Sequence, residues 1–302
     1  MRILVTGAAG YIGSALVRAL PADVIATDQT SMPFPNAVVG NIAYPQFARS
    51  LVTPEVGVVF HLASLVSGGA EQNFELGIKV NLDATRDLLE ACRLTGHRPR
   101  FIFASTIAVY GGKLPDPVTD ETPPSPRISY GAQKLICEVL IDDYARRGYV
   151  DGRALRLPAV IVRPGSANTA VSGWASAIIR EPLAGRDYTC PVAPHTRMAC
   201  ISLGRVVDAF KRIAELPNDR LGARRTVLLT GISVSAQQMW DAVKAKAKGR
   251  VRFEPAPALQ AIMDAGPKAT LSQRAAELGL PHNGSIEEIV REYEETALAH
   301  HG

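Results

Sequence analysis

The chain has 302 residues, a length that suits one large α/β domain or two domains sharing a core. Hydrophobic residues make up 47% and charged residues 21%, which excludes a disordered, collagen-like or coiled-coil protein. The formal net charge is +4 and the basic residues are scattered, so no nucleic-acid partner is expected. No apolar stretch reaches the roughly 20 residues that span a bilayer, so no membrane partner is expected.

The four cysteines predict the compartment. Cys92, Cys137, Cys190 and Cys200 lie far apart and lack CxxC spacing, which indicates free thiols in a reducing environment. The amino terminus enters an apolar strand directly, without the pattern of a secretory signal. We therefore expect a cytoplasmic protein with no bound metal.

Short apolar runs alternate with helical patterns in the first half of the chain. Strands are expected at 2–6, 23–27, 38–39, 56–62, 100–105 and 153–157, with helices at 11–20, 46–51, 79–93 and 130–146. Near-continuous runs of Val, Ile and Leu between helices are typical of a parallel sheet covered on both faces. The predicted fold class is therefore α/β, a doubly wound parallel sheet.

The second half is less regular. A helix is expected at 172–180, and a helix at 203–215 with a strand at 226–229 looks like a return to the main sheet. Further helices are expected at 236–246, 257–264, 271–278 and 286–297. We predict a nucleotide-binding domain over 1–160, rejoined by about 203–230, and a smaller substrate-binding lobe from 161–202 and 231–302.

A glycine-rich turn between the first strand and the first helix indicates a dinucleotide site. Gly7, Gly10 and Gly13 allow a tight turn and a close approach to a pyrophosphate, which the helix N-terminus attracts. Asp28, at the end of the second strand, can accept hydrogen bonds from ribose hydroxyls and repel a 2′-phosphate. No Arg or Lys follows at 29–32, so NAD is expected rather than NADP. A purely structural turn is the alternative.

A Tyr/Lys pair opens the helix predicted at 130–146. Tyr130 and Lys134 are four residues apart and share one helix face, where the ammonium can lower the pKa of the phenol. Tyr130 can then act as general base and take a proton from a substrate hydroxyl while hydride leaves the same carbon. Ser105 and Thr106 end the preceding strand; we expect Thr106 to contact the substrate and Ser105 the cofactor.

These motifs together resemble the extended short-chain dehydrogenase/reductase family. The resemblance implies a Rossmann-type NAD-binding fold, a role for Lys134 on the nicotinamide ribose, and a homodimer formed by the helices around 79–93 and 136–146. Most of this branch acts on nucleotide-sugars. His61 is expected to be a buried structural residue. The cofactor contacts that the resemblance implies beyond Gly7, Gly10, Gly13, Asp28, Ser105, Tyr130 and Lys134 are Tyr11, Ile12, Asn41, Ile42, Leu62, Ala63, Ser64, Asn81 and Pro158.

Four stretches, at 66–71, 148–158, 162–165 and 179–183, are similar to a narrower group, the D-erythronate dehydrogenases. These are NAD-dependent enzymes that oxidise C2 of a four-carbon sugar acid. A sugar-acid carboxylate needs a fixed cation, and the candidates are Arg163, Arg180 and Arg197, with Arg180 favoured. Ser67 and Ser172 are candidate partners for substrate hydroxyls, beside Thr106 and Tyr130.

Two alternatives remain open at this stage. One is a nucleotide-sugar epimerase, dehydratase or reductase of the same branch. The other is a non-catalytic nucleotide-sensing module, against which the intact Tyr130 and Lys134 count.

Overall fold

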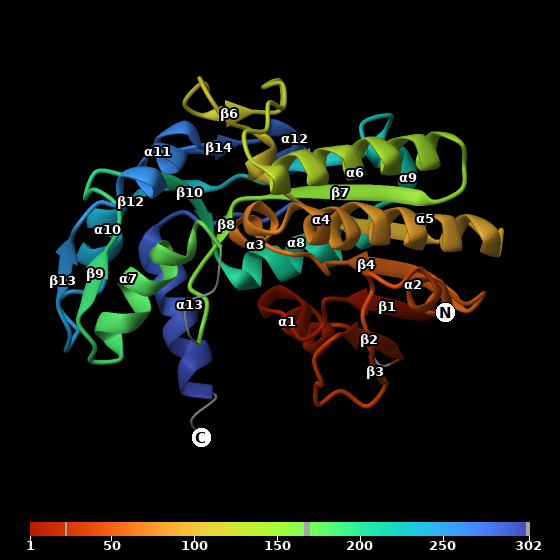
Figure 1. Ribbon diagram of the computed structural model, residues 1–302, viewed down its shortest axis with the longest axis horizontal. Helices are drawn as coiled ribbons and strands as arrows, with labels where there is room; N and C mark the ends of the chain where they lie inside the picture. Colours follow the sequence, from red (N-terminus) through yellow and green to blue (C-terminus); the bar gives the residue numbers. More distant parts are fainter. Residues whose placement is uncertain (22, 166–169, 300–302) are drawn as a thin grey trace.

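The computed structural model of the protein describes residues 1–21, 23–165 and 170–299. A seven-stranded sheet dominates it, in the order β11-β7-β5-β4-β1-β2-β3, with every neighbouring pair parallel (Figure 1). The doubly wound α/β fold predicted from the sequence is confirmed. Its strands are β1 (Arg2–Thr6), β2 (Val24–Asp28), β3 (Ala37–Val39), β4 (Val56–His61), β5 (Arg100–Thr106), β7 (Asp151–Leu157) and β11 (Thr226–Leu228).

Helices cover both faces of this sheet because successive side chains of each strand point to opposite sides. Val5 and Ile102 join the core formed with α1 (Tyr11–Ala19) and α8 (Leu203–Glu215). Their neighbours Leu4 and Phe101 join the core on the other face. That face is covered by α2 (Pro45–Ser50), α5 (Ala84–Thr95) and α6 (Ser129–Arg146).

Short elements that the sequence patterns do not predict fill the connections. The expected helix over 79–93 begins as a π-helical segment, Ile78–Asp83, which runs into α5. The other short elements here are α3 (Ser67–Gln72), α4 (Phe74–Gly77), a 3₁₀ turn at Ile107–Val109, β6 (Val118–Thr119) and α9 (Asn218–Leu221).

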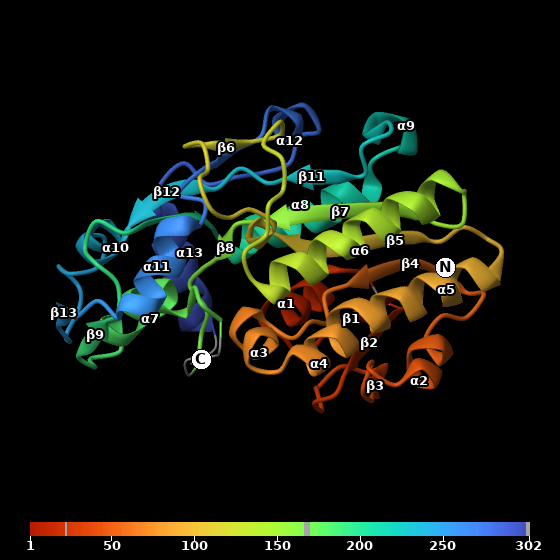
Figure 2. The same ribbon diagram turned by 45° about the horizontal axis from the view of Figure 1, so that its top comes forward.

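A smaller lobe packs beside the carboxyl edge of the main sheet (Figures 1 and 2). It contains a three-stranded sheet, β12-β10-β8, and the parallel pair β13-β9. A separate apolar core, which includes Trp174, Ile178, Met239 and Ile289, holds the lobe together. Its elements are β8 (Ala159–Val160), α7 (Gly173–Leu183), β9 (Tyr188–Cys190), β10 (Arg197–Ile201), β12 (Ile232–Ser235), α10 (Ala236–Asp241), β13 (Val251–Phe253), α11 (Pro257–Ala265) and α13 (Ile286–Ala299).

One part of the 231–302 segment differs from the expected division. β14 (Thr270–Leu271) pairs with β6, and α12 (Gln273–Glu277) packs against β11 of the main sheet. Leu278 and Leu280, just after α12, are buried in the main core. The chain therefore crosses back over the main domain here, because these apolar side chains cover the sheet beside its edge strand β11.

The strand order reverses between β1 and β4, whose crossover connections run to opposite sides. In such sheets the crevice at the carboxyl ends of the two strands is where ligands bind. Within the described part of the chain, no helix is both long and apolar enough to cross a membrane.

Candidate active site

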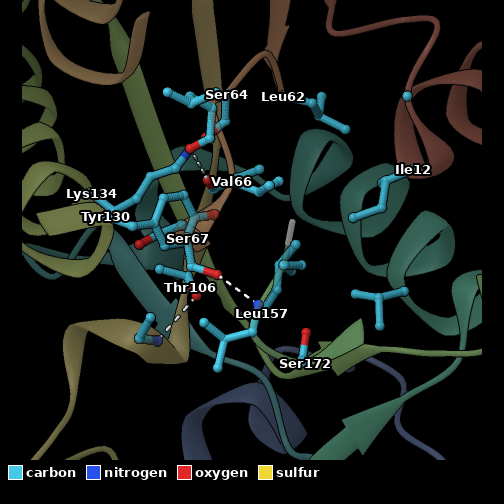
Figure 3. A pocket seen from close by; sticks show the side chains of 18 of the residues that line it. Ile12, Leu62, Ser64, Val66, Ser67, Thr106, Tyr130, Lys134, Leu157 and Ser172 are labelled. Atoms are coloured by element: carbon cyan, nitrogen blue, oxygen red, sulfur yellow. Dashed lines mark hydrogen bonds between the residues drawn. The ribbon is translucent and has the colours of Figure 1, made fainter. Parts of the chain in front are cut away.

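A cavity of about 690 Å³ opens at this crevice. Its walls come from the carboxyl ends of β1, β2, β4, β5 and β7, and the lobe closes it with residues 170–172 and 261–267. Figure 3 shows Ser64, Thr106, Tyr130 and Lys134 grouped at one end, with Ile12 on the opposite side. The cavity is long enough along the sheet edge to be lined by both the glycine-rich turn and the Tyr/Lys pair.

The glycine-rich turn leaves no room for side chains. Gly7 has a φ of +71°, and a Cβ there would lie 2.6 Å from the backbone nitrogen of Ala63. A Cβ on Gly13 would lie 2.1 Å from the carbonyl oxygen of Gly7. Gly10 is the N-cap residue of α1 and has no side chain to cover the helix N-terminus. The turn thus presents bare backbone to the cavity, which fits a dinucleotide pyrophosphate.

The adenosine end of the cavity contains the expected acid. Asp28 accepts backbone hydrogen bonds from Ala9 (3.1 Å) and Thr30 (3.1 Å), which fix its carboxylate at the end of β2. Asn41 and Ile42 line the cavity next to it, and Asn41 uses its side-chain oxygen to accept from the backbone of Ala43 (2.9 Å).

His61 supports the cavity wall from inside the protein. Its Nδ1 lies 2.7 Å from the Thr6 hydroxyl and its Nε2 lies 2.9 Å from the Thr85 hydroxyl. The Thr6 oxygen also accepts from the backbone nitrogens of Leu62 and Ala63, both at 3.2 Å. Burial lowers the pKa of His61 to about 3, with a further contribution from the Lys134 charge, so the ring is neutral. It has the structural role that the sequence suggests.

The Tyr130 phenol lies between two hydroxyl groups. Its neighbours Ser64, from the loop after β4, and Thr106, at the end of β5, act on its pKa as hydrogen-bonding partners. Burial raises the pKa of Tyr130, while these hydrogen bonds and the Arg163 charge act in the opposite direction. The expected lowering by Lys134 is wrong for this structure, because desolvation of the phenolate is the largest effect and Lys134 has another partner.

That partner is a backbone carbonyl. The Lys134 ammonium donates to the oxygen of Ala104 (2.9 Å) and lies 5.7 Å from the centre of the Tyr130 ring. Burial lowers the pKa of Lys134 to about 8. The ammonium is therefore fixed in the wall beside the phenol and remains largely protonated at neutral pH.

The structure distinguishes the three candidate arginines. Arg163 lines the cavity, and no carboxylate among the described residues forms an ion pair with it. Arg180 is outside the wall: it pairs with Glu181 (2.7 Å) and donates to the carbonyl of Arg163 (2.6 Å). Arg197 is also outside the wall and pairs with Asp116. Burial lowers the pKa of Arg163, and the neighbouring phenols of Tyr130 and Tyr11 raise it.

Most predicted site residues lie on the cavity wall, but four do not play the part expected from the sequence. Arg180 and Arg197 are two of these four. Asn81 is the third, because it is buried behind the wall and accepts a hydrogen bond from the backbone of Leu65. Ser105 reaches the wall, but its hydroxyl donates to Glu138 in the interior, since it points to the opposite side of β5 from Thr106. The predicted residues on the wall are Gly7, Gly10, Tyr11, Ile12, Gly13, Asp28, Asn41, Ile42, Leu62, Ala63, Ser64, Ser67, Ser105, Thr106, Tyr130, Lys134, Pro158, Arg163 and Ser172.

Several wall residues have no signal in the sequence patterns. Tyr110 follows the Ser105-Thr106 pair closely and accepts a hydrogen bond from Arg156 (2.6 Å). Arg127 lies against Gly111 and Gly112 at the wall. It is three residues before Tyr130 in the sequence, and this closeness could have predicted its place on the cavity wall. Residues 261–267 form the end of an ordinary amphipathic helix and the loop after it, which only the tertiary fold brings to the cavity.

The comparisons with known proteins agree with this geometry. Residues 3–219 match the model of the NAD dependent epimerase/dehydratase family. The chain belongs to this family. Its extended short-chain dehydrogenase/reductase character and its cofactor, NAD, both predicted from the sequence, are thereby confirmed. The bare glycine turn, Asp28 and the Tyr/Lys pair are the parts of the cavity that fit NAD.

Individual members of the family cover nearly the whole chain. D-erythronate dehydrogenase from Cupriavidus necator is 43% identical over 98% of this chain and 99% of its own length. D-erythronate dehydrogenase from Haemophilus influenzae is 36% identical over 97% and 98%. The crystal structure of a nucleoside-diphosphate-sugar epimerase from Agrobacterium tumefaciens has a TM-score of 0.92 and 34% identity, and the match covers 99% of this chain and 95% of that one.

Proposed function

We propose that this protein is an NAD-dependent dehydrogenase that oxidises the C2 hydroxyl of D-erythronate to the 2-oxo acid. The observation that carries the proposal is the grouping of Tyr130, Thr106 and Arg163 on one cavity wall, where Arg163 has no ion pair with a described carboxylate. Such a wall offers a base, a hydroxyl and a cation to a hydroxy acid. The similarity to two D-erythronate dehydrogenases over nearly the full chain supports the same substrate.

The residues divide the chemistry among them. Tyr130 takes the proton of the C2 hydroxyl, and Thr106, whose oxygen accepts from the backbone of Ala108 (3.0 Å), keeps its own proton free to donate to the substrate oxygen. NAD, held by the glycine-rich turn and Asp28, would supply the hydride acceptor for C2. Lys134 keeps a positive charge beside the phenol, held by the carbonyl of Ala104. The proton leaves Tyr130 for solvent before the next turnover.

Arg163 is the residue that we assign to the substrate carboxylate. Its backbone nitrogen donates to the Ser176 hydroxyl oxygen (3.0 Å) and its carbonyl accepts from Arg180, so the main chain is held on both sides. Its guanidinium lies over the Tyr11 ring, 5.9 Å from the ring centre. A cation fixed in this way can bind a carboxylate through two parallel hydrogen bonds.

Two variants test this assignment. Arg163→Gln is expected to lower kcat/KM for D-erythronate about thirtyfold, corresponding to about 2 kcal/mol for a lost charge-assisted hydrogen bond. Arg197→Gln is the matched control and is expected to leave kcat/KM within twofold, because Arg197 is outside the cavity wall. Equal losses in both variants would contradict the assignment.

A nucleotide-sugar epimerase is the alternative, favoured by the 34% identity to the nucleoside-diphosphate-sugar epimerase from Agrobacterium tumefaciens. An epimerase regenerates its oxidised cofactor in each cycle, whereas a dehydrogenase releases reduced cofactor. Absorbance of reduced nicotinamide is therefore measured with NAD and a panel of sugar acids and UDP-sugars. The proposed function predicts a steady increase with D-erythronate, and an absence of signal across the sugar acids would refute it.

We also propose that the protein forms a homodimer through α6. Ile136 and Val139 lie three residues apart on this helix and are 45% and 64% exposed, and Phe74 of the adjacent α4 is 60% exposed. A second copy of the chain can cover this apolar face. Sedimentation is expected to give twice the chain mass of 32.3 kDa, and Val139→Glu is expected to give the monomer. Leu271→Glu, at an exposed site on β14, is the control that keeps the dimer.

The cytoplasm is the proposed compartment. All four cysteines are free and buried, as expected of a protein that stays in a reducing environment. Titration of the denatured protein with a thiol reagent is expected to find four thiols, and fewer would contradict this proposal.

A further inference from the structure

Ser64 places a hydroxyl group on the cavity wall at the end that contains Tyr130 (Figure 3). It follows Leu62 and Ala63 in the loop after β4. Hydrogen bonding with Ser64 and with Thr106 acts to lower the pKa of the Tyr130 phenol. Thr106 was expected at the reacting group, but the hydroxyl of Ser64 was not.

The hydrogen of the Ser64 hydroxyl can be placed from its second partner, the side chain of Asn81. The Asn81 oxygen accepts from the backbone nitrogen of Leu65 (2.8 Å), and the Asn81 nitrogen donates to the carbonyl of Leu65 (3.0 Å). These two bonds fix which end of the amide is the oxygen. The Asn81 nitrogen uses its other hydrogen for Gln133 (2.7 Å). The Ser64 hydroxyl, 3.0 Å from the Asn81 oxygen, is therefore the donor in that pair.

This arrangement suits the neutral phenol and can reverse for the phenolate. While Ser64 donates to Asn81, its oxygen is free to accept the proton of the Tyr130 hydroxyl. A phenolate can only accept, and rotation of the Ser64 hydroxyl alone brings a donor to it. Asn81 is not left unsatisfied by the rotation, because its oxygen keeps the hydrogen bond from Leu65. A hydrogen bond to an ionised acceptor is also the stronger one.

We propose that Ser64 is a further catalytic residue, whose hydroxyl turns from Asn81 to Tyr130 and donates a hydrogen bond to the phenolate. The proposal rests on the role of Tyr130 as general base in the proposed function. It explains how the Tyr130 phenolate, whose formation burial opposes, receives a hydrogen bond although Lys134 donates to the carbonyl of Ala104.

Other charged and titratable groups near Tyr130 stay the same when Ser64 is changed. Lys134 and Glu138 belong to the same helix, His61 is neutral at the end of β4, and Arg163 comes from the lobe. Glu71 of α3 accepts from the backbone of Ser129 at the start of α6 (2.9 Å). These groups contribute equally to the pKa of Tyr130 in all Ser64 variants. A difference in that pKa between the variants is therefore due to the Ser64 hydroxyl.

The experiment compares wild type, Ser64→Ala and Ser64→Thr as complexes with NAD. Protein labelled with ¹³C at the tyrosine Cζ is titrated by NMR, with the Tyr130 signal assigned from Tyr130→Phe. Ser64→Ala is expected to raise the titration midpoint of Tyr130 by about 0.5 to 1 pH unit, and Ser64→Thr to restore it. The acidic limb of the kcat profile is expected to move to higher pH in parallel. KM for the sugar acid and the Kd for NAD are expected to stay within twofold.

Two results would overturn the proposal. One is the same Tyr130 midpoint in wild type and Ser64→Ala. The other is a pH-independent loss of activity in Ser64→Ala with weakened NAD binding, which would make Ser64 a cofactor contact only. The NMR titration uses no sugar acid, so it keeps its meaning even if D-erythronate proves not to be the substrate.

Discussion

Acid is expected to destabilise this protein through His61, and the structure gives the size of the effect. The Thr85 hydroxyl donates to the carbonyl of Asn81 (2.7 Å), so it must accept from His61 Nε2. The Thr6 oxygen already accepts two backbone N–H groups, so its proton faces Nδ1. Protonation of Nδ1 would place two donors against each other in a buried site.

The folded protein therefore binds this proton only near pH 3, whereas an unfolded chain binds it near 6.5. Between these two values the unfolded state holds one proton more than the folded state, so stability decreases as the pH falls. Each pH unit in that window costs about 1.4 kcal/mol. Integrated from pH 7 to pH 5, the loss from His61 alone is about 2 kcal/mol.

Urea unfolding at pH 5, 6 and 7 measures this loss. His61→Asn is expected to be less stable than wild type at pH 7, because the hydrogen bonds to Thr6 and Thr85 are disturbed, and to lose about 2 kcal/mol less stability on going to pH 5. The matched control, His97→Asn, removes a histidine outside this network and leaves the His61 contribution in place. The same pH dependence in wild type and His61→Asn would refute the reasoning.

Three further outcomes follow from the cavity wall. Tyr130→Phe is expected to lower turnover by about 10² to 10⁴ while NAD affinity, measured by calorimetry, is unchanged. Gly13→Ala is expected to weaken NAD binding at least about tenfold in the same calorimetric titration, because its Cβ meets the carbonyl of Gly7 at 2.1 Å. Asp28→Asn is expected to reduce the preference for NAD over NADP by about tenfold in kcat/KM, since the charge that repels a 2′-phosphate is lost; an unchanged preference would show that Asp28 is only a turn residue.

The sequence predicts the nucleotide half of the site well because its signals are local. Gly7, Gly13 and Asp28 act through backbone conformation and a strand end, and Tyr130 and Lys134 through one helical turn. The main sheet is predictable for a related reason: buried parallel strands are short, continuous apolar runs. The strands of the lobe are only two to five residues long, and their pairing partners are distant in the chain.

The substrate half depends on contacts that the sequence does not contain. Arg180 lies on the predicted helix, but it forms an ion pair with Glu181 and donates a hydrogen bond to the carbonyl of Arg163. Arg163 itself has no helical pattern around it, and only the packing of the lobe brings it to the cavity. The pKa of Tyr130 shows the same limit, since the Tyr/Lys spacing contains no information on burial or on the carbonyl of Ala104 that holds Lys134.

The measurement that tests the central claim most directly is the oxidation of D-erythronate carrying deuterium at C2. Wild-type protein with NAD is expected to form reduced nicotinamide that contains the deuterium, together with the 2-oxo acid in equal amount, as found by mass spectrometry. Turnover is expected to depend on Tyr130. Reduced nicotinamide that contains no deuterium would contradict the account. So would a protein that leaves D-erythronate unoxidised but converts a nucleotide-sugar.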